Sequence, residues 1–324
     1  MRVSRARLPL CLCLVPYALS LAACLPVTRP VVKIGLVAPF EGRYRDVGYE
    51  VIYAVRLAVR EANARGGIAG YSVELLALDD AGAPELAREQ ARKITVDPQI
   101  VGVVGHWLES TTLAAASAYE TAAIPFLATA AAPDLPASAF RVWPTDAALR
   151  AALPGALYCP APCDSLEDLE WLISRRSSGV PPQFRRPAAV QASNLHLAGP
   201  PLWGQPQFAL LAGAAAEGVY FVAPAPLPAQ SADPGFADRY RALSNGVEPR
   251  SNAVLAYDAA QILFEAIARD VAHSGAPSRA GVAAALSQTD FSGLSGRFSF
   301  DARRSWSQAK GWVYQWRNGL AVIP

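Results

Sequence analysis

Residues 101–133, VGVVGHWLESTTLAAASAYETAAIPFLATAAAP, decide the fold of this chain. An apolar strand at 101–104 runs into a turn at 105–108, a helix begins near Ser110, and a second apolar strand follows at 124–128. This order predicts a β-α-β unit. In a parallel sheet, ligands bind outside the carboxyl ends of the strands, where helix N-termini present free N–H groups. The turn is therefore the first candidate for a binding surface.

The segments before this unit repeat the alternation of strand and helix. The apolar run at 31–38, VVKIGLVA, is predicted to be a buried strand, and residues 71–78 form the next one. Between them, residues 48–64 carry apolar side chains at helical spacing and end before two glycines, and Pro84 opens a further helix. Strands that alternate with helices of this length imply parallel crossovers. The N-terminal third is therefore predicted to be a doubly wound α/β domain.

The later part of the chain gives weaker patterns. We predict a helix at 207–216, a strand at 219–222 and an amphipathic helix at 257–270. The alternating residues at 311–323 surround Asn318-Gly319, which is typical of a hairpin with a two-residue turn.

The first residues of the chain resemble a targeting signal and not a part of the fold. Three arginines precede an apolar stretch at 8–19, and the motif LAAC at 21–24 resembles the bacterial lipobox, whose cysteine carries lipid. An ordinary signal peptide or membrane anchor is the alternative, but the apolar stretch is short for a membrane span. We expect residues 1–23 to be a lipoprotein signal peptide, Cys24 to be lipidated and residues 24–30 to form a tether.

Composition excludes several classes of protein. The 324 residues are 52% hydrophobic and 17% charged, which is enough for two domains with proper cores. Loss of Arg2, Arg5 and Arg7 with the signal takes the basic residues from 29 to 26, against 27 acidic ones. The mature chain is thus close to neutral, and nothing favours a nucleic-acid partner or an acidic membrane surface.

Two cysteines stay in the mature chain besides Cys24. Cys159 and Cys163 stand in the motif CPAPC, which in an exported protein favours a local disulfide. A metal site needs further ligands, and the three histidines of the chain lie far from this motif in sequence. We therefore predict no metal site.

Several short motifs carry a resemblance to a known family. They are VKIG at 32–35, EANARGGI at 61–68, LDDA at 78–81, GH at 105–106, FR at 140–141 with Asp146, LAGAAAEGVY at 211–220 and AYDAA at 256–260. In this order they resemble the branched-chain amino-acid (Leu/Ile/Val) binding proteins of ABC transporters, which are type I periplasmic binding proteins.

The resemblance implies two α/β lobes with doubly wound parallel sheets, joined by a hinge. It places lobe 1 at 31–142 plus 249–289, and lobe 2 at 143–248 plus 290–324. Between Asp146 and Cys159 the family carries a further strand, helix and strand, for which this chain has too few residues. The second lobe is therefore predicted to be shortened.

The resemblance also implies where a ligand binds. In the family, a hydroxyl residue four positions after the glycine of Gly-His, and a Ser or Thr in the loop after the next strand, hold the carboxylate of an amino acid. These positions are Glu109 and Ala132 here, and neither suits an anion. A zwitterionic amino acid is therefore a less expected ligand.

Two readings of Glu109 follow. The commoner one is an acid at the start of a helix, beside Ser110 as N-cap, with no role in binding. In the other, its carboxylate offers acceptors to a neutral or cationic ligand such as an amide, a urea-like compound, an amine or a heterocycle.

Further positions complete the predicted wall of the site. Trp107 either lines the apolar part of the ligand or packs between the lobes, and Asn252 is either a contact or an N-cap. No residue of the second lobe can be carried over. The predicted ligand-binding residues are Val47, Trp107, Leu108, Glu109, Ser110, Ala130, Ala131, Ala132 and Asn252.

The sequence lacks the common enzyme motifs. There is no P-loop, dinucleotide-binding glycine motif, nucleophile elbow or His-Glu-x-x-His, and Asp79-Asp80 reads as a pair of turn formers. We predict no catalytic residues and no cofactor, and a secreted hydrolase is only a third reading.

The expected function is that of an extracytoplasmic solute-binding lipoprotein of an ABC importer. It would bind a small amino-acid-like or amide- or amine-type solute by hinge closure and hand it to a permease. It would be a monomer, anchored by lipid to the cell membrane in the periplasm or on the outer face. The alternative is a lipoprotein on the same fold that serves as an interaction or regulatory module without transport.

Overall fold

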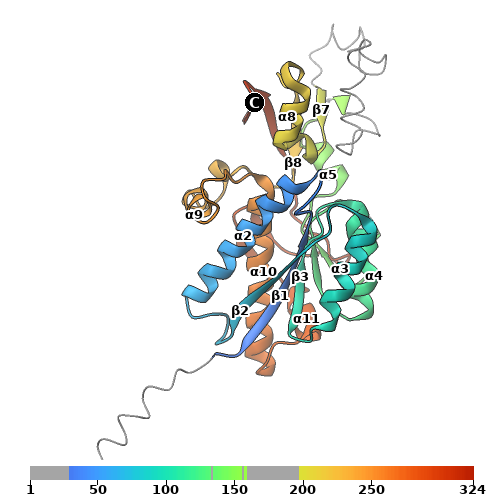
Figure 1. Cartoon of the computed structure of the whole chain (residues 1–324), viewed down its shortest axis with the longest axis vertical. Helices are drawn as coiled ribbons and strands as arrows, with labels where there is room; N and C mark the ends of the chain where they lie inside the picture. The colour runs from blue at the N-terminus through green and yellow to red at the C-terminus, as the bar shows by residue number, and fades with distance from the viewer. Residues whose placement is uncertain (1–28, 133, 155–156, 159–196) are drawn as a thin grey trace, which may run out of the picture. The chain divides into compact units, whose positions relative to one another are not determined.

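The computed structural model describes residues 29–132, 134–154, 157–158 and 197–324 (Figure 1). The predicted signal peptide, Cys24 and the pair Cys159 and Cys163 lie outside the described residues. Within the described part, no helix combines the length and the apolar character that crossing a bilayer requires.

The first sheet contains five strands that pair only in parallel. Their order, β2-β1-β3-β4-β5, reverses direction between β1 and β3, which confirms the predicted doubly wound topology. Parallel strands are covered on both faces and need continuous apolar sequence; β3 is buried along its whole length. The strands are β1 (Val31–Ala38), β2 (Ser72–Asp79), β3 (Ile100–Val104), β4 (Phe126–Ala128) and β5 (Ala139–Arg141).

Helices cover both faces of this sheet. Figure 1 shows α3 (Pro84–Val96) and α4 (Glu109–Thr121) along one side, and α2 (Arg45–Ala64) with α10 (Ser251–Ser274) along the other, as their packing pairs also show. A shorter helix, α11 (Arg279–Leu286), packs on α10. The predicted start of α3 at its proline is confirmed.

The second sheet is mixed. Its order is β12-β11-β8-β7-β6, in which β6 (Leu157–Tyr158), β7 (Leu197–Gly199) and β8 (Tyr220–Ala223) pair in parallel. Strand β11 (Trp312–Arg317) pairs antiparallel with β8 and with β12 (Leu320–Val322). The pairing of the last residue of β11 with the first of β12 confirms the predicted hairpin.

Short helices pack on this sheet. They are the 3-10 helix η3 (Pro201–Gly204), the helix α8 (Pro206–Ala212) and a second 3-10 turn, η4 (Gly213–Ala216). The single helix predicted at 207–216 is therefore wrong in its second half. Gly213 follows α8 with a φ of 53°, a left-handed conformation that ends the α-helix there.

Several elements had no sequence prediction. The helix α9 (Phe236–Leu243) packs on α2, where the Tyr240 hydroxyl donates to the carbonyl of Glu50 at 2.9 Å. The strands β9 (Phe291–Gly293) and β10 (Gly296–Phe298) form a small hairpin, and Phe298 joins the core of α2 and α10. The helices α5 (Asp146–Ala151) and η5 (Pro228–Gln230) were not predicted either, and the same is true of β5, β7, η3 and α11.

These contacts bear on the lobe boundaries, which stay a prediction. Residues in α9 and β10 fall within the ranges that the sequence analysis gave to lobe 2, yet they share a core with the first sheet. These contacts favour a second lobe whose first segment ends near residue 224 and whose last segment begins near residue 311. The shortening of the second lobe likewise stays a prediction.

Candidate functional site

A cavity of about 600 Å³ has walls from elements of both sheets. The first sheet contributes the turn after β3, the residues after β4 and β5, and the start of α2. The second sheet contributes residues after β7, through η3, and Val222 of β8. The volume lies within the range of about 300 to 1,000 Å³ that is typical of sites for small molecules.

The cavity brings together nearly all of the predicted ligand-binding residues. Ala132 is the exception: it is buried, it does not line the cavity, and its carbonyl accepts a hydrogen bond from the Arg141 guanidinium. That these residues bind a ligand stays a prediction. Those on the wall are Val47, Trp107, Leu108, Glu109, Ser110, Ala130, Ala131 and Asn252.

A chain of buried polar side chains holds the turn after β3. Asp80 Oδ2 lies 2.6 Å from His106 Nδ1, and His106 Nε2 lies 3.1 Å from the Tyr119 hydroxyl. All three residues are fully buried. Burial raises the pKa of Tyr119, so its hydroxyl stays protonated. Because each hydrogen bond is directional, this chain fixes the position of the imidazole and of the turn that carries it.

The backbone of the same turn is fixed as well. The His106 carbonyl accepts from the hydroxyls of Thr112 at 3.2 Å and Thr129 at 2.9 Å. Gly105 has a φ of 123°, and a Cβ there would lie 2.2 Å from the carbonyl oxygen of Val37. Only glycine fits this position. The Gly-His pair therefore determines the path of the backbone into residues 107–110, which line the cavity.

The two acids at the end of β2 differ in role. Asp79 Oδ1 accepts from the backbone N–H groups of Phe40 at 2.7 Å and Ala81 at 2.8 Å, which confirms it as a turn former. Asp80 also accepts from the N–H of Gly82 at 2.9 Å, but its contact with His106 was not predicted. The sequence signal for it was present, since Gly-His and Asp-Asp both follow strands that flank β1.

Glu109 is the first residue of α4, and it lines the cavity. The N-cap is Leu108, with no side-chain hydrogen bond, so the prediction of Ser110 as N-cap was wrong. Glu109 thus lies in the first turn of α4, as expected of an acid that only stabilises the start of the helix. It also lies on the cavity wall, as expected of an acid that contacts a ligand, so both interpretations are compatible with its position.

Asn252 is not an N-cap either. The N-cap of α10 is Arg250, and Asn252 is a buried residue of the first turn. Glu50 caps this helix from α2, because its Oε1 accepts from the N–H groups of Arg250 at 3.1 Å and Ala253 at 2.9 Å. Burial raises the pKa of Glu50, against the lowering effect of these donors and of the Arg250 charge.

Other wall residues were missed by sequence reasoning. Trp143 lies just past the carboxyl end of β5, a position that the strand-end rule identifies. Gln205 and Leu202 come from the second sheet's side, and no sequence pattern points to them. The short helix α5 adds Asp146 and Arg150, both exposed.

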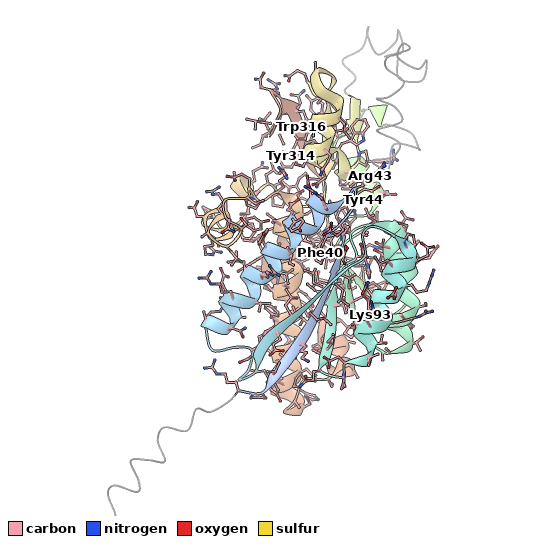
Figure 2. All side chains as sticks on the ribbon, in the orientation of Figure 1. Phe40, Arg43, Tyr44, Lys93, Tyr314 and Trp316 are labelled. Atoms are coloured by element: carbon pink, nitrogen blue, oxygen red, sulfur yellow. The ribbon has the colours of Figure 1, made fainter. Side chains whose placement is uncertain are left out.

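Tyr44 connects the two sides. It is the N-cap of α2, but its ring is buried in the aromatic cluster of the second sheet, which includes Trp203, Tyr314 and Trp316 (Figure 2). Close by in sequence, the carboxylate of Asp46 accepts a hydrogen bond from the amide of Gln207 in α8.

The described residues hold no cluster of three or more His, Cys, Asp or Glu side chains placed to bind a metal. The charged groups on the wall are Glu109, Asp146 and Arg150, and the rest of it is apolar, aromatic or neutral. The geometry therefore suits the binding of a small molecule.

Sequence comparison identifies relatives with this architecture. The sequence pattern of the periplasmic binding protein family matches residues 31–156 and 185–320 of this chain. The chain is 32% identical to the Leu/Ile/Val-binding protein of Escherichia coli K12 over 112 residues, which are 34% of this chain and 30% of that protein. It is 32% identical over 93 residues to an amino acid binding protein of Pseudomonas aeruginosa, covering 29% of this chain and 25% of that protein. The matched stretches thus span less than a third of either relative.

Solved structures share the fold over nearly the whole chain. The substrate-binding protein LivJ of Streptococcus pneumoniae, in complex with isoleucine, superposes with a TM-score of 0.73 at 19% identity, covering 90% of this chain and 98% of that one. A solute-binding protein of R. palustris, in complex with benzoate, gives 0.65 at 19% identity, with 90% and 95% covered. At this identity the likeness concerns the fold. Because the family match covers more than half of its residues, the chain belongs to the periplasmic binding protein family, and it has the type I fold.

Proposed function

We propose that this protein is the solute-binding component of an ABC importer. The observation that carries the proposal is the cavity of about 600 Å³ whose walls come from both sheets. A ligand in it contacts both sides at once, so binding favours the conformation in which the sides are close. The protein needs no chemistry for this task, only a difference in affinity between its open and closed conformations.

The proposed ligand is a small amino-acid-like or amide- or amine-type solute. The wall offers an apolar surface through Val47, Trp107 and Leu202, which suits a hydrocarbon or aromatic part. The N-terminus of α4 would favour an anion, but Glu109 brings its own negative charge to that place. A neutral or cationic polar group is therefore the better match there.

The remaining parts of the proposal concern location and partners. Lipid on Cys24 would anchor the protein to the membrane outside the cytoplasm, in the periplasm or on the outer face, where a monomer delivers its solute to a permease. The names of the similar proteins support the transport role, since they are substrate-binding proteins of ABC transporters.

A thermal-shift screen of the purified full-length protein tests the proposal. The panel contains leucine, isoleucine, benzoate, urea, isovaleramide and isoamylamine. A ligand at a hundredfold its dissociation constant stabilises the folded state by about 2.7 kcal/mol, which raises the melting temperature clearly. No shift with any compound would overturn solute binding and favour an interaction module instead.

The Glu109→Ser variant tests the role of the acid. If the carboxylate faces the ligand, the affinity for isoamylamine falls by about tenfold or more, because a charge-assisted contact is lost. Glu85→Ser is the matched control, since Glu85 is an exposed acid in the first turn of α3 and does not line the cavity. Equal affinities of the two variants would show that Glu109 is only a helix-start acid.

A further inference from the structure

A hydrogen bond that lies outside the cavity joins its two sides. The carboxylate of Asp46, in the first turn of α2, accepts from the side-chain amide of Gln207, in the first turn of α8. The two residues are 161 positions apart, and α2 packs with the first sheet whereas α8 packs with the second. Neither residue lines the cavity. Any influence of this Asp46/Gln207 pair on a solute therefore acts through the positions of the two sides.

The charge of Asp46 strengthens the pair. Its Oδ2 accepts from Gln207, while its Oδ1 lies 3.9 Å from Nε of Arg45, whose side chain is exposed. A hydrogen bond to a charged group contributes more than one between neutral groups. The side chain of Asp46 is 38% exposed, so water screens it in part and the contribution belongs at the lower end of that range.

Two apolar side chains of the first side reach the second side as well. Tyr44, two residues before Asp46, is buried in the aromatic cluster of the second sheet, and Leu108 packs against the same cluster. A Cβ on Gly82 would lie 2.8 Å from Tyr44 Cδ2 and 3.1 Å from Leu108 Cδ1, so both side chains occupy the space that a larger residue would need. Tyr44 and Leu108 also line the cavity. Only the Asp46/Gln207 pair therefore separates the joining of the sides from contact with a solute.

We infer that the Asp46/Gln207 pair is a positioning contact, which holds the two sides together in the protein without a ligand and raises its affinity for every solute by the same factor. The inference rests on the proposed function, in which a solute contacts both sides. Because the pair is formed only while the sides are close, its free energy favours that conformation over a separated one. Because it touches no solute, the gain does not depend on the chemistry of the solute.

The Gln207→Glu variant breaks the pair without a change in size. It places a second carboxylate against Asp46, and the two like charges repel each other. At the second position of α8 an acid is otherwise favoured by the helix macrodipole, so the substitution should not weaken α8 itself. Small-angle X-ray scattering of the full-length protein without ligand should give a larger radius of gyration for Gln207→Glu than for the wild type.

A second variant shows whether the effect comes from the pair. Asp46→Asn combined with Gln207→Glu exchanges donor and acceptor, because the asparagine amide can donate to the new carboxylate. The radius of gyration should return to that of the wild type. If the two residues acted independently, their effects would add and no recovery would occur. Gln288→Glu adds the same charge at an exposed position outside the cavity wall and should change nothing.

The affinity is measured by isothermal titration with leucine, isoamylamine, isovaleramide and benzoate. Each compound that binds the wild type should bind Gln207→Glu about tenfold more weakly, as the loss of one partly exposed, charge-assisted hydrogen bond implies. The factor should be the same for all of them. The variant with both substitutions should regain the affinity of the wild type.

The outcomes are distinct. Equal radii of gyration for the wild type and Gln207→Glu would overturn the inference and leave the proposed function standing. An expansion that the exchanged pair does not reverse would overturn it too, as would a loss of affinity that differs from one compound to the next. If no compound of the panel binds, the proposed function fails, whereas the scattering experiment still decides whether the pair holds the two sides together.

Discussion

The two sides of the cavity are stabilised in different ways. Among the described residues, the buried acids Glu50, Asp80, Asp258 and Asp270 all belong to elements that pack with the first sheet. The core of the second sheet is aromatic: Trp203 stacks on Phe208 with ring centroids 4.8 Å apart, and Trp316 lies next to Phe208.

The two kinds of contact differ in how closely they fix the positions of the side chains on each side of the cavity. Hydrogen bonds to buried carboxylates are directional and costly to break, so they specify one arrangement. Stacked rings are held by the non-directional hydrophobic effect and by weak ring preferences, which tolerate small displacements. We therefore expect the first side to present a fixed wall and the second side to adjust to the ligand.

The largest expected effect concerns pH. Asp258 in α10 accepts from the N–H groups of Leu294 at 2.7 Å and Ser295 at 2.8 Å, and burial raises the pKa of its carboxyl to about 7. A raised pKa means that the folded state binds this proton more tightly than the unfolded one. The contribution is fully present below about pH 4 and is lost as the pH rises through about 7, with a total on the order of 4 kcal/mol.

Urea unfolding at several pH values measures this loss. The Asp258→Asn variant cannot titrate there, so its profile between pH 4 and 7 should be flatter than that of the wild type. Profiles of equal slope would mean that the Asp258 carboxyl does not contribute this pH dependence.

Asp80→Ala should have the next largest effect. It removes the partner of a fully buried histidine and the acceptor of the Gly82 N–H, at a cost of about 3 kcal/mol or more. Tyr119→Phe removes only the hydroxyl that contacts His106 Nε2, at the other end of this series of hydrogen bonds, and should lower the free energy of unfolding by about 1 kcal/mol. The unfolding free energies in urea give both values. If the two variants were equally stable, the turn would not depend on this chain of hydrogen bonds.

Gly199→Ala examines the second side and should have a smaller effect than Asp80→Ala. A Cβ there would lie 1.9 Å from the indole of Trp203, so the ring must move. In an adjustable wall the cost is about 1 to 2 kcal/mol, near the lower end for overpacked sites. Tryptophan fluorescence reports the movement and urea unfolding the cost. A loss as large as that of Asp80→Ala would show that the second side is as rigid as the first.

The sequence predicted the elements that depend on local pattern. Apolar runs between helical stretches were sufficient for β1 to β4, and Asn318-Gly319 was sufficient for the last hairpin. The N-cap of α4 was missed because buried contacts of His106 fix the backbone before it, so that Leu108 takes the position in place of the hydroxyl residue Ser110.

The candidate site was predictable only on the first side. Its residues follow strand ends and the Gly-His pair, which the resemblance to the family marks. Gln205 and Tyr44 depend on contacts between segments about 160 residues apart, as the bond between Asp46 and Gln207 illustrates, and such pairing leaves no periodic signal. The missed helix α9 follows a stretch rich in proline and serine that reads as loop.

The position of Tyr44 has a consequence for the affinity of the protein. Its ring belongs to the first helix and is buried with the aromatic residues of the second sheet, so separating the two sides exposes apolar surface to water. Burial of this ring therefore stabilises the arrangement in which the two sides are in contact. The apparent dissociation constant equals the intrinsic one divided by the fraction of molecules that are competent to bind. If the protein binds a solute by closure, as proposed, the contacts of Tyr44 would offset part of the free-energy cost of that closure.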